Sequence, residues 1–395
     1  MEEDYNNLRQ ALHTELHAIL NYWQNNTVDG LHGGFVGKRD FYNNLIPKAS
    51  KGIILNTRIL WAFSAASNYL KSDTYTSICK RSYDYLQTKF RDKVNKGVFW
   101  ELDYVGQPVN SRKQAYAQAF AIYALSEYYT FSKNEDAKHW AIELFECLEL
   151  HARDKKHLGY LEAFNEDWTE IKDMRLSDKD MNAAKTMNTH LHVLEAYTSL
   201  LKIYDHHPLK DALKLLIELF HQKFLNCEHH YDLFFDENWT LLSDSVSYGH
   251  DIEAAWLVMD AAELVGDEKL LTHAKNIALK VADTFIAEAV DSDGGVFNEK
   301  NRTTAHIDTD KHWWPQVEAL VGLDYAYALT QDPKYAKCAL QIWDFTKNNL
   351  IDHDHGEWHF RVDKEGNNYS QEDKVSMWKA PYHTTRACIK LNTNI

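Results

Sequence analysis

The chain has 395 residues, 45% of them hydrophobic, and a formal net charge of −15, so it can bury a large core but is poorly suited to bind nucleic acid or an anionic membrane. No stretch approaches the roughly 18 apolar residues of a membrane span. The five cysteines are scattered without a CxxC pair, and the start MEEDYNNLRQ lacks the pattern of a signal peptide. We therefore expect a cytoplasmic protein without a zinc site or a redox dithiol.

Two kinds of helical segment alternate along the chain. The first predicted helix, at 8–23, is amphipathic, and an extended piece at 31–41 follows it. Segments rich in alanine, leucine and aromatic residues on nearly all faces, typical of buried helices, then begin in turn at residues 62, 121, 193, 255, 319 and, as a shorter segment, 384. Each of the first five is followed by a more amphipathic helix, such as 267–285 and 332–350.

Short extended pieces with glycine and aromatic residues follow these amphipathic helices, at 96–103, 158–168, 231–240, 294–300 and 356–363. They predict small hairpins or loops. The chain opens with an amphipathic helix that has no buried partner before it and closes with a buried-type helix that has no amphipathic partner after it, so joining the two ends gives six helix pairs, as a closed ring requires. We predict a single all-α domain over residues 1–395, an (α/α)6 barrel of six inner and six outer helices, with short β-hairpins or loops at the end where the inner helices begin.

The inner helices of such a ring all run in one direction, so their first turns face a common pocket. Polar and aromatic side chains lie at the predicted starts of all six. They are Arg58, Tyr116, Asn188, His190, His192, His250, Glu253, Trp313, Trp314, Glu318, Trp378 and His383. Convergent polar groups at a concave surface indicate a small-molecule site.

Three kinds of chemistry fit these residues, and two of them are less well supported. A metal site lacks a helical ligand pair such as HExxH, and His190 and His192, two residues apart, point to different faces of a helix. A glycoside hydrolase needs two carboxylates across the pocket, for example Glu253 with Asp180 or Glu318. The sequence allows this second reading, but it leaves the histidines without a role.

A pair of acid–base histidines is the third possibility. Imidazole takes up and returns a proton near neutral pH, and the positive end of a helix helps to keep a histidine neutral. His250 lies at such a helix start in SYGHDIEAAW, and His383 follows Pro381, a residue suited to an early helical position. Inversion of a C–H centre beside a carbonyl requires one base on each face, and Arg58 is suited to hold the oxygen that gains negative charge.

Several long motifs occur in the order found in a known family. NTRILWAFSAA, KTMNTHLHVLEAYT, SYGHDIEAAW, WWPQVEALVG and the closing W-x-x-P-Y-H resemble the N-acylglucosamine 2-epimerase family, and most of all its cellobiose 2-epimerase branch, from about residue 30 to about residue 390. The resemblance implies an (α/α)6 barrel. It also implies interconversion of glucose and mannose at the reducing end of β-1,4-linked disaccharides such as cellobiose, lactose and mannobiose, without a cofactor or a metal.

The resemblance also implies roles for individual residues. By their places in the motifs, His250 and His383 resemble the two acid–base histidines, and Arg58 resembles the arginine beside C1 and C2 of the sugar. Asp180 matches a pocket acid, and Trp378 resembles the aromatic residue that stacks on the non-reducing sugar. The residues that resemble sugar-contacting or orienting groups are Tyr116, Asn188, His192, Glu253 and Trp314.

The implied reaction leaves some alternatives open. After ring opening, one histidine removes the C2 proton, and the other returns a proton to the opposite face of the enediolate; a rotation about C2–C3 is a second route. Within the superfamily, the alternatives are a monosaccharide aldose–ketose isomerase and an N-acetylglucosamine 2-epimerase. A glycoside hydrolase or a non-catalytic binding protein are alternatives of other classes. We expect an oligosaccharide substrate and a monomer or weak homo-oligomer.

Overall fold

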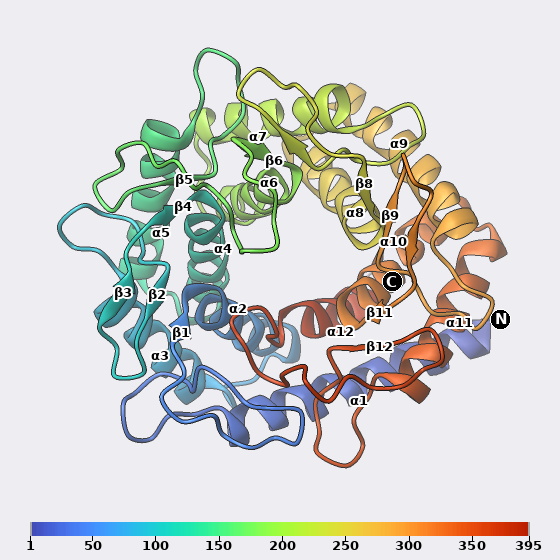
Figure 1. Ribbon diagram of the computed structural model, residues 1–395, viewed down its shortest axis with the longest axis horizontal. Coiled ribbons are helices and arrows are strands. Elements are labelled where there is room, and N and C mark those ends of the chain that lie inside the picture. Colours follow the sequence, from blue (N-terminus) through green and yellow to red (C-terminus); the bar gives the residue numbers. More distant parts are fainter. Residues whose placement is uncertain (1, 394–395) are drawn as a thin grey trace.

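Over residues 2–393, which the computed structural model describes, twelve α-helices form two concentric rings (Figure 1). The inner ring consists of α2 (Ile53–Leu70), α4 (Ala115–Ser132), α6 (Met187–Leu201), α8 (Tyr248–Val265), α10 (Trp313–Thr330) and α12 (Tyr382–Thr393). The outer ring consists of α1 (Glu2–Asn26), α3 (Thr76–Tyr85), α5 (Glu135–Cys147), α7 (His207–Leu219), α9 (Glu268–Glu288) and α11 (Pro333–Asn349).

The ring closes where the two ends of the chain meet. Helix α12 packs against both α1 and α2, and the side-chain amide of Asn392 donates to the backbone carbonyl of Arg9 at 3.2 Å. The half repeats at the two ends therefore complete each other, and the predicted (α/α)6 barrel is confirmed.

The two rings differ in how much of each helix is buried. In α2 every residue from Ile53 to Ser67 is buried, whereas α7 buries a stripe that includes Leu209, Leu213 and Leu216. A stripe at this spacing covers one face of a helix, so the amphipathic helices lie outside and the uniformly apolar ones inside. No helix in the described part of the chain is long and apolar enough to cross a membrane.

Three outer helices continue into a π-helical turn at their C-terminal ends. These turns are η1 (Leu86–Phe90) after α3, η2 (Leu148–Ala152) after α5 and η3 (Phe220–Phe224) after α7. The last residue of each turn is fully buried. The chain therefore enters the protein interior at the π-helical turn, before it continues to the end of the barrel where the inner helices begin.

Short strands surround the end of the barrel where the inner helices begin. They are β1 (Lys51–Gly52), β2 (Glu101–Leu102), β3 (Pro108–Asn110), β4 (Lys113–Gln114), β5 (Ala163–Phe164), β6 (Lys185–Thr186), β7 (Phe234–Phe235), β8 (Ser245–Ser247), β9 (Glu299–Asn301), β10 (Ile307–Asp308), β11 (Lys311–His312) and β12 (Arg361–Val362).

The pairing of these strands differs in part from the predicted hairpins. Hairpins are present as β2–β3 and β9–β10. Elsewhere the strand before an inner helix pairs antiparallel with the strand after the next outer helix, in the pairs β1–β2, β4–β5, β6–β7, β8–β9 and β11–β12. The backbone groups before each inner helix need partners, and the returning chain supplies them. The strand pairing thereby joins the beginning and the end of each helix pair at one end of the barrel.

An ion pair with a buried lysine recurs at the same point of the repeat. A lysine two residues before an inner helix binds an aspartate that follows an outer helix, in the pairs Lys51–Asp29, Lys113–Asp92, Lys185–Asp154 and Lys311–Asp291. All four lysine side chains are buried. In the fourth repeat, Val246 stands in place of the lysine and Asn226 in place of the aspartate. Both charges are absent together there, so neither is left unpaired in the interior.

Candidate active site

The first turns of the inner helices surround a cavity of about 160 Å³. Nine of the ten residues predicted for the site line it, namely Arg58, Tyr116, Asn188, His192, His250, Glu253, Trp314, Trp378 and His383. The tenth, Asp180, lines an adjoining cavity of about 300 Å³ that shares Asn188 and His250 with the first. Together the two reach the range of about 300–1,000 Å³ usual for small-molecule sites.

Three charged or titratable residues of SYGHDIEAAW lie in the first two turns of α8, and one of them faces away from the cavity. His250 faces the cavity. Asp251 instead faces the outer layer, where it accepts a hydrogen bond from the backbone N–H of Tyr231 at 2.8 Å and pairs with Nδ1 of His230 at 2.7 Å. Glu253 is fully buried beside the cavity. Of the three, Asp251 supports the fold, and the other two belong to the site.

Gly249 allows an aromatic side chain to approach the start of α8. A Cβ atom at this position would lie 2.4 Å from Trp314, closer than any ordinary contact. The Trp314 ring instead packs against the imidazole of His250, with 4.8 Å between the ring centroids. The glycine therefore lets Trp314 fix one side of the His250 ring.

His250 is held as a neutral imidazole. Burial lowers its pKa to about 4, and the nearby charge of Arg58 acts in the same direction. Its Nδ1 lies 2.8 Å from Oγ of Ser247, the residue that precedes α8. A histidine that stays neutral at pH 7 and is oriented through one ring nitrogen is suited to act as a base through the other.

His383 lies in the first turn of α12 and has a carboxylate partner. Its Nδ1 is 2.7 Å from Oε1 of Glu318. This contact places the proton on Nδ1, leaves Nε2 for the cavity and stabilises the ring when Nε2 takes up a proton. Burial lowers the pKa of His383 well below its usual value, and Glu253 opposes this effect.

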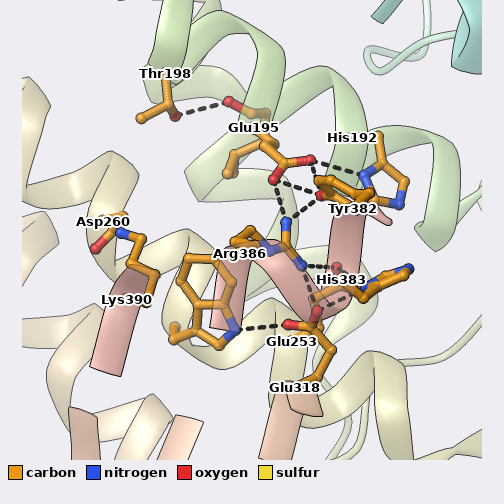
Figure 2. A network of polar contacts seen from close by, with 12 residues as sticks. His192, Glu195, Thr198, Glu253, Asp260, Glu318, Tyr382, His383, Arg386 and Lys390 are labelled. Carbon is orange, nitrogen blue, oxygen red and sulfur yellow. Dashed lines mark hydrogen bonds and ion pairs between the residues drawn. The ribbon is translucent and has the colours of Figure 1, made fainter. Parts of the chain in front are cut away.

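A buried arginine lies between three glutamates beneath the cavity (Figure 2). The guanidinium of Arg386 donates to Glu195, Glu253 and Glu318. Burial raises the pKa of Glu253 and of Glu318. Burial also acts to raise the pKa of Glu195, but Arg386 and His192 outweigh it and lower the value to about 2.

This cluster also orients two rings of the cavity. Glu195 binds Nδ1 of His192 at 3.0 Å, just as Glu318 binds Nδ1 of His383. Arg386 therefore binds both Glu195 and Glu318, the carboxylates that orient His192 and His383 (Figure 2).

Arg58 brings a positive charge to the cavity wall. Its guanidinium donates to the hydroxyl of Tyr116 and to the backbone carbonyl of Trp378, both at 3.0 Å, and lies over the ring of Phe120. Within residues 2–393, no carboxylate lies within ion-pair distance of Arg58. Its charge remains available for an oxygen that becomes negative during a reaction.

The same geometry bears on the metal and glycosidase hypotheses. Glu253, Glu318 and His383 converge closely enough to ligate a metal ion, but Arg386 already donates to both carboxylates and supplies the cation there. A glycosidase needs two carboxylates on either side of a glycosidic bond. Here Glu253 and Glu318 share one guanidinium, and Asp180 lies in the adjoining cavity, where it accepts hydrogen bonds from Ser177.

His190 does not line either cavity, contrary to the expectation that it faces the pocket. It is fully buried, its Nδ1 donates to the carbonyl of Thr186 at 2.7 Å, and its Nε2 accepts from the backbone N–H of Tyr160 at 2.9 Å. His190 therefore ties the start of α6 to the neighbouring loop. Conversely, Phe360, which lines the cavity, was not predicted, although it lies in the extended piece 356–363.

Replacing His190 with glutamine is expected to flatten the pH dependence of stability. Burial lowers the pKa of His190 to about 3 from 6.5, so between these values the unfolded chain binds a proton that the folded chain does not, and stability falls as the pH falls. From pH 7 to pH 5 this residue alone removes about 2 kcal/mol. Urea unfolding at both pH values measures the difference. Equal losses in the wild type and in His190→Gln would contradict the assignment.

The fold and the site together define an (α/α)6-barrel protein with a cavity lined by histidines, an arginine and aromatic rings where the inner helices begin. The model of the family described as N-acylglucosamine 2-epimerase (GlcNAc 2-epimerase) matches residues 34–387, and the chain belongs to this family.

Individual relatives agree over almost the whole chain. A cellobiose 2-epimerase of Bacteroides fragilis is 42% identical over 386 residues, which cover 97% of this chain and 98% of that protein. The solved structure of the cellobiose 2-epimerase from Bacillus thermoamylovorans B4167 matches with a TM-score of 0.94 at 36% identity, covering 99% of this chain and 100% of that one. A D-mannose isomerase of Marinomonas mediterranea is 25% identical over 87% of this chain and 86% of that protein. The predicted family and the predicted isomerase class are confirmed.

Proposed function

We propose that the chain is a disaccharide 2-epimerase that interconverts glucose and mannose at the reducing end of β-1,4-linked disaccharides such as cellobiose. The observation that carries this proposal is the meeting of His250 from α8, His383 from α12 and Arg58 from α2 at one cavity. The full-length similarity to cellobiose 2-epimerases supports the choice of substrate.

The two histidines differ in a way that supports separate roles. In the open-chain sugar, the C2 proton is acidic because it lies beside the C1 aldehyde. Neutral His250 takes this proton, the C–H electron pair forms the C1–C2 double bond, and the negative charge passes to O1 beside Arg58. Before this step His383 takes up a solvent proton on Nε2, where the Glu318 carboxylate stabilises the charged ring, and it then delivers that proton to the other face of C2. The step leaves His250 charged and His383 neutral, and proton exchange with solvent restores both. C2 is neither oxidised nor reduced overall, so the proposal includes no cofactor.

Trp378 is proposed as a platform for the non-reducing sugar. It precedes α12, is half-buried and lines the cavity, with its ring centroid 6.0 Å from that of Tyr116. Trp378→Ala is expected to raise KM for cellobiose about tenfold, which corresponds to about 1.4 kcal/mol, with little change in melting temperature. In contrast, Trp140→Ala in the buried face of α5 should cost about 3–5 kcal/mol of stability and leave KM unchanged. If Trp378→Ala instead loses much stability and keeps its KM, Trp378 is a core residue and not a sugar platform.

Incubation with cellobiose in heavy water, without an added cofactor, tests the proposed function. A base that exchanges its proton with solvent puts deuterium on C2, so the product 4-O-glucosyl-mannose should lack its C2–H signal in proton NMR. Product with C2–H fully retained would exclude proton transfer through solvent-exchanging histidines. Free glucose would instead indicate a glycoside hydrolase.

An aldose–ketose isomerase is the second candidate, favoured by the relative named as a D-mannose isomerase. It would deliver the proton to C1 of the same enediolate and give a ketose. The heavy-water experiment separates the two candidates, because a ketose product carries its deuterium on C1.

We further propose that residues 1–395 form one domain that acts in the cytoplasm.

A further inference from the structure

A second cavity lies at the opposite end of the barrel, where the inner helices end. Its volume is about 330 Å³, and five of the six inner helices line it, namely α2, α4, α6, α8 and α12. None of its lining residues belongs to the 160 Å³ cavity at the other end. We refer to it as the lower cavity.

Aromatic rings form much of the lower cavity wall. Trp61 and Tyr123 stack with ring centroids 5.0 Å apart, and Trp256 and Tyr69 are also part of the lining. Only 6% of Trp61 is exposed, and among the residues that the structure describes its indole N–H has no hydrogen-bond acceptor. A buried donor without an acceptor is costly, but this N–H is itself closed off from the cavity space. A bound molecule would therefore meet the flat apolar face of the Trp61 ring.

The charges around the lower cavity balance. Lys390 pairs with Asp260, and Arg386 pairs with Glu195 (Figure 2). The two remaining charged residues, Glu127 and Lys202, have opposite signs. A ligand with a net charge would therefore meet no excess of the opposite charge.

Uncharged polar groups complete the lining. The side chains of Asn68, Thr198 and Ser199 face the lower cavity alongside the charged groups. The hydroxyl of Thr198 donates to the carbonyl of Leu194 at 2.7 Å, which leaves its oxygen lone pairs for a second donor. The Asn68 amide donates to Glu127. Polar groups and apolar ring faces thus line one small volume.

We propose that the lower cavity is a second binding site, for a neutral polyhydroxylated molecule of monosaccharide size. The hydroxyl groups of such a molecule both donate and accept, which matches the mixed polar lining, and its C–H faces pack on aromatic rings. The volume lies at the lower end of the range of about 300–1,000 Å³ for small-molecule sites. The proposal does not rest on the proposed epimerase activity, although Glu195 and Arg386 in this lining belong to the network that orients His192 and His383.

Methyl β-D-glucopyranoside is a suitable probe, because its anomeric centre is blocked and it cannot open to an aldehyde. In protein labelled with ¹⁵N at tryptophan, the indole signal of Trp61, assigned with Trp61→Phe, should shift in a saturable way. A dissociation constant of about 1 mM is expected for a ligand of this size. The absence of a shift at saturating probe would overturn the proposal.

Two variants locate the bound probe. Ser199→Phe places a ring in the lower cavity and should weaken binding at least tenfold, while kcat for cellobiose and the melting temperature show that the fold is intact. Glu127→Ala, which removes a polar lining group without adding bulk, should also weaken binding. The matched control is Ser132→Phe, at the exposed end of α4 and outside the lower cavity, which should bind as the wild type does. A Trp61 shift that persists unchanged in Ser199→Phe would arise from another site and would overturn the proposal.

A charged analogue tests the class of ligand. Methyl β-D-glucuronide has the same ring with one carboxylate. Because the charges around the lower cavity balance, it should bind more weakly than the neutral glycoside, by about tenfold if one desolvated carboxylate is left without a partner. Equal or tighter binding of the glucuronide would overturn the assignment to neutral ligands.

Discussion

Alanine in place of His250 or His383 is expected to lower kcat for epimerisation by about 10²- to 10⁴-fold, the usual effect of losing a general acid or base. Neither side chain supports the core: His250 borders the cavity, and the partner of His383, Glu318, keeps its bond to Arg386. The melting temperatures should therefore stay close to that of the wild type. His190→Gln, which changes a buried histidine outside the cavity, should keep kcat near the wild-type value.

Isotope exchange in the same two variants tests whether each histidine serves one face of C2. A protein with one remaining base still removes the C2 proton of the epimer whose C–H points at that base, and returns solvent deuterium to the same face. One variant should therefore exchange cellobiose without epimerising it, and the other should exchange 4-O-glucosyl-mannose. If both variants exchange the same epimer, the two-face assignment is wrong and rotation about C2–C3 is favoured. Near wild-type epimerisation by either soluble variant would remove that histidine from the mechanism.

The sequence was most informative where the repeat and the helix starts coincide. SYGHDIEAAW predicts a helix start at a polar turn, and α8 begins at Tyr248 within it. The closing W-x-x-P-Y-H predicts another, and α12 begins at Tyr382, directly after Pro381. Because all inner helices of a closed ring share one direction, the side chains at their starts come together. Of the twelve residues predicted at these starts, ten line one cavity, and His190 and Glu318 do not.

The network beneath the cavity was not predicted, although its residues carry a signal. Glu195 and Arg386 are charged residues inside segments that otherwise predict buried helices, and a charge in such a place requires a partner. The two are 191 positions apart, so their contact follows only from the way the ring closes. Five of the strand pairings have the same origin, since two helices lie between the partner strands in the chain.

The recurring lysine was open to prediction and was missed. Aligning the repeats on the inner-helix starts places Lys51, Lys113, Lys185 and Lys311 at one position. An aspartate recurs after the outer helices in the same repeats, and both are absent from the fourth repeat, where Val246 and Asn226 replace them. Because the two opposite charges are lost together, they are expected to contact each other. This inference needs only a comparison of the repeats within the one chain.

Arg386→Met is expected to cost about 3–5 kcal/mol of stability, the usual loss when one partner of a buried ion pair is removed. The variant leaves Glu195, Glu253 and Glu318 buried without the cation that all three bind. For a chain of 395 residues, this corresponds to a fall in melting temperature of about 4–6 °C.

Two further variants separate the loss of this buried charge from a general effect of substitution in α12. Lys390→Met removes a cation one turn later in α12 that is a quarter exposed and pairs with Asp260; because the pair is only partly buried, it should cost no more than about 1 kcal/mol. Adding Glu253→Gln to Arg386→Met removes one of the three carboxylates that repel each other and should restore part of the lost stability. Thermal melts followed by circular dichroism measure all three proteins. If Arg386→Met melts together with Lys390→Met, or if Glu253→Gln lowers its stability further, the glutamates do not depend on Arg386 in the way that the structure indicates.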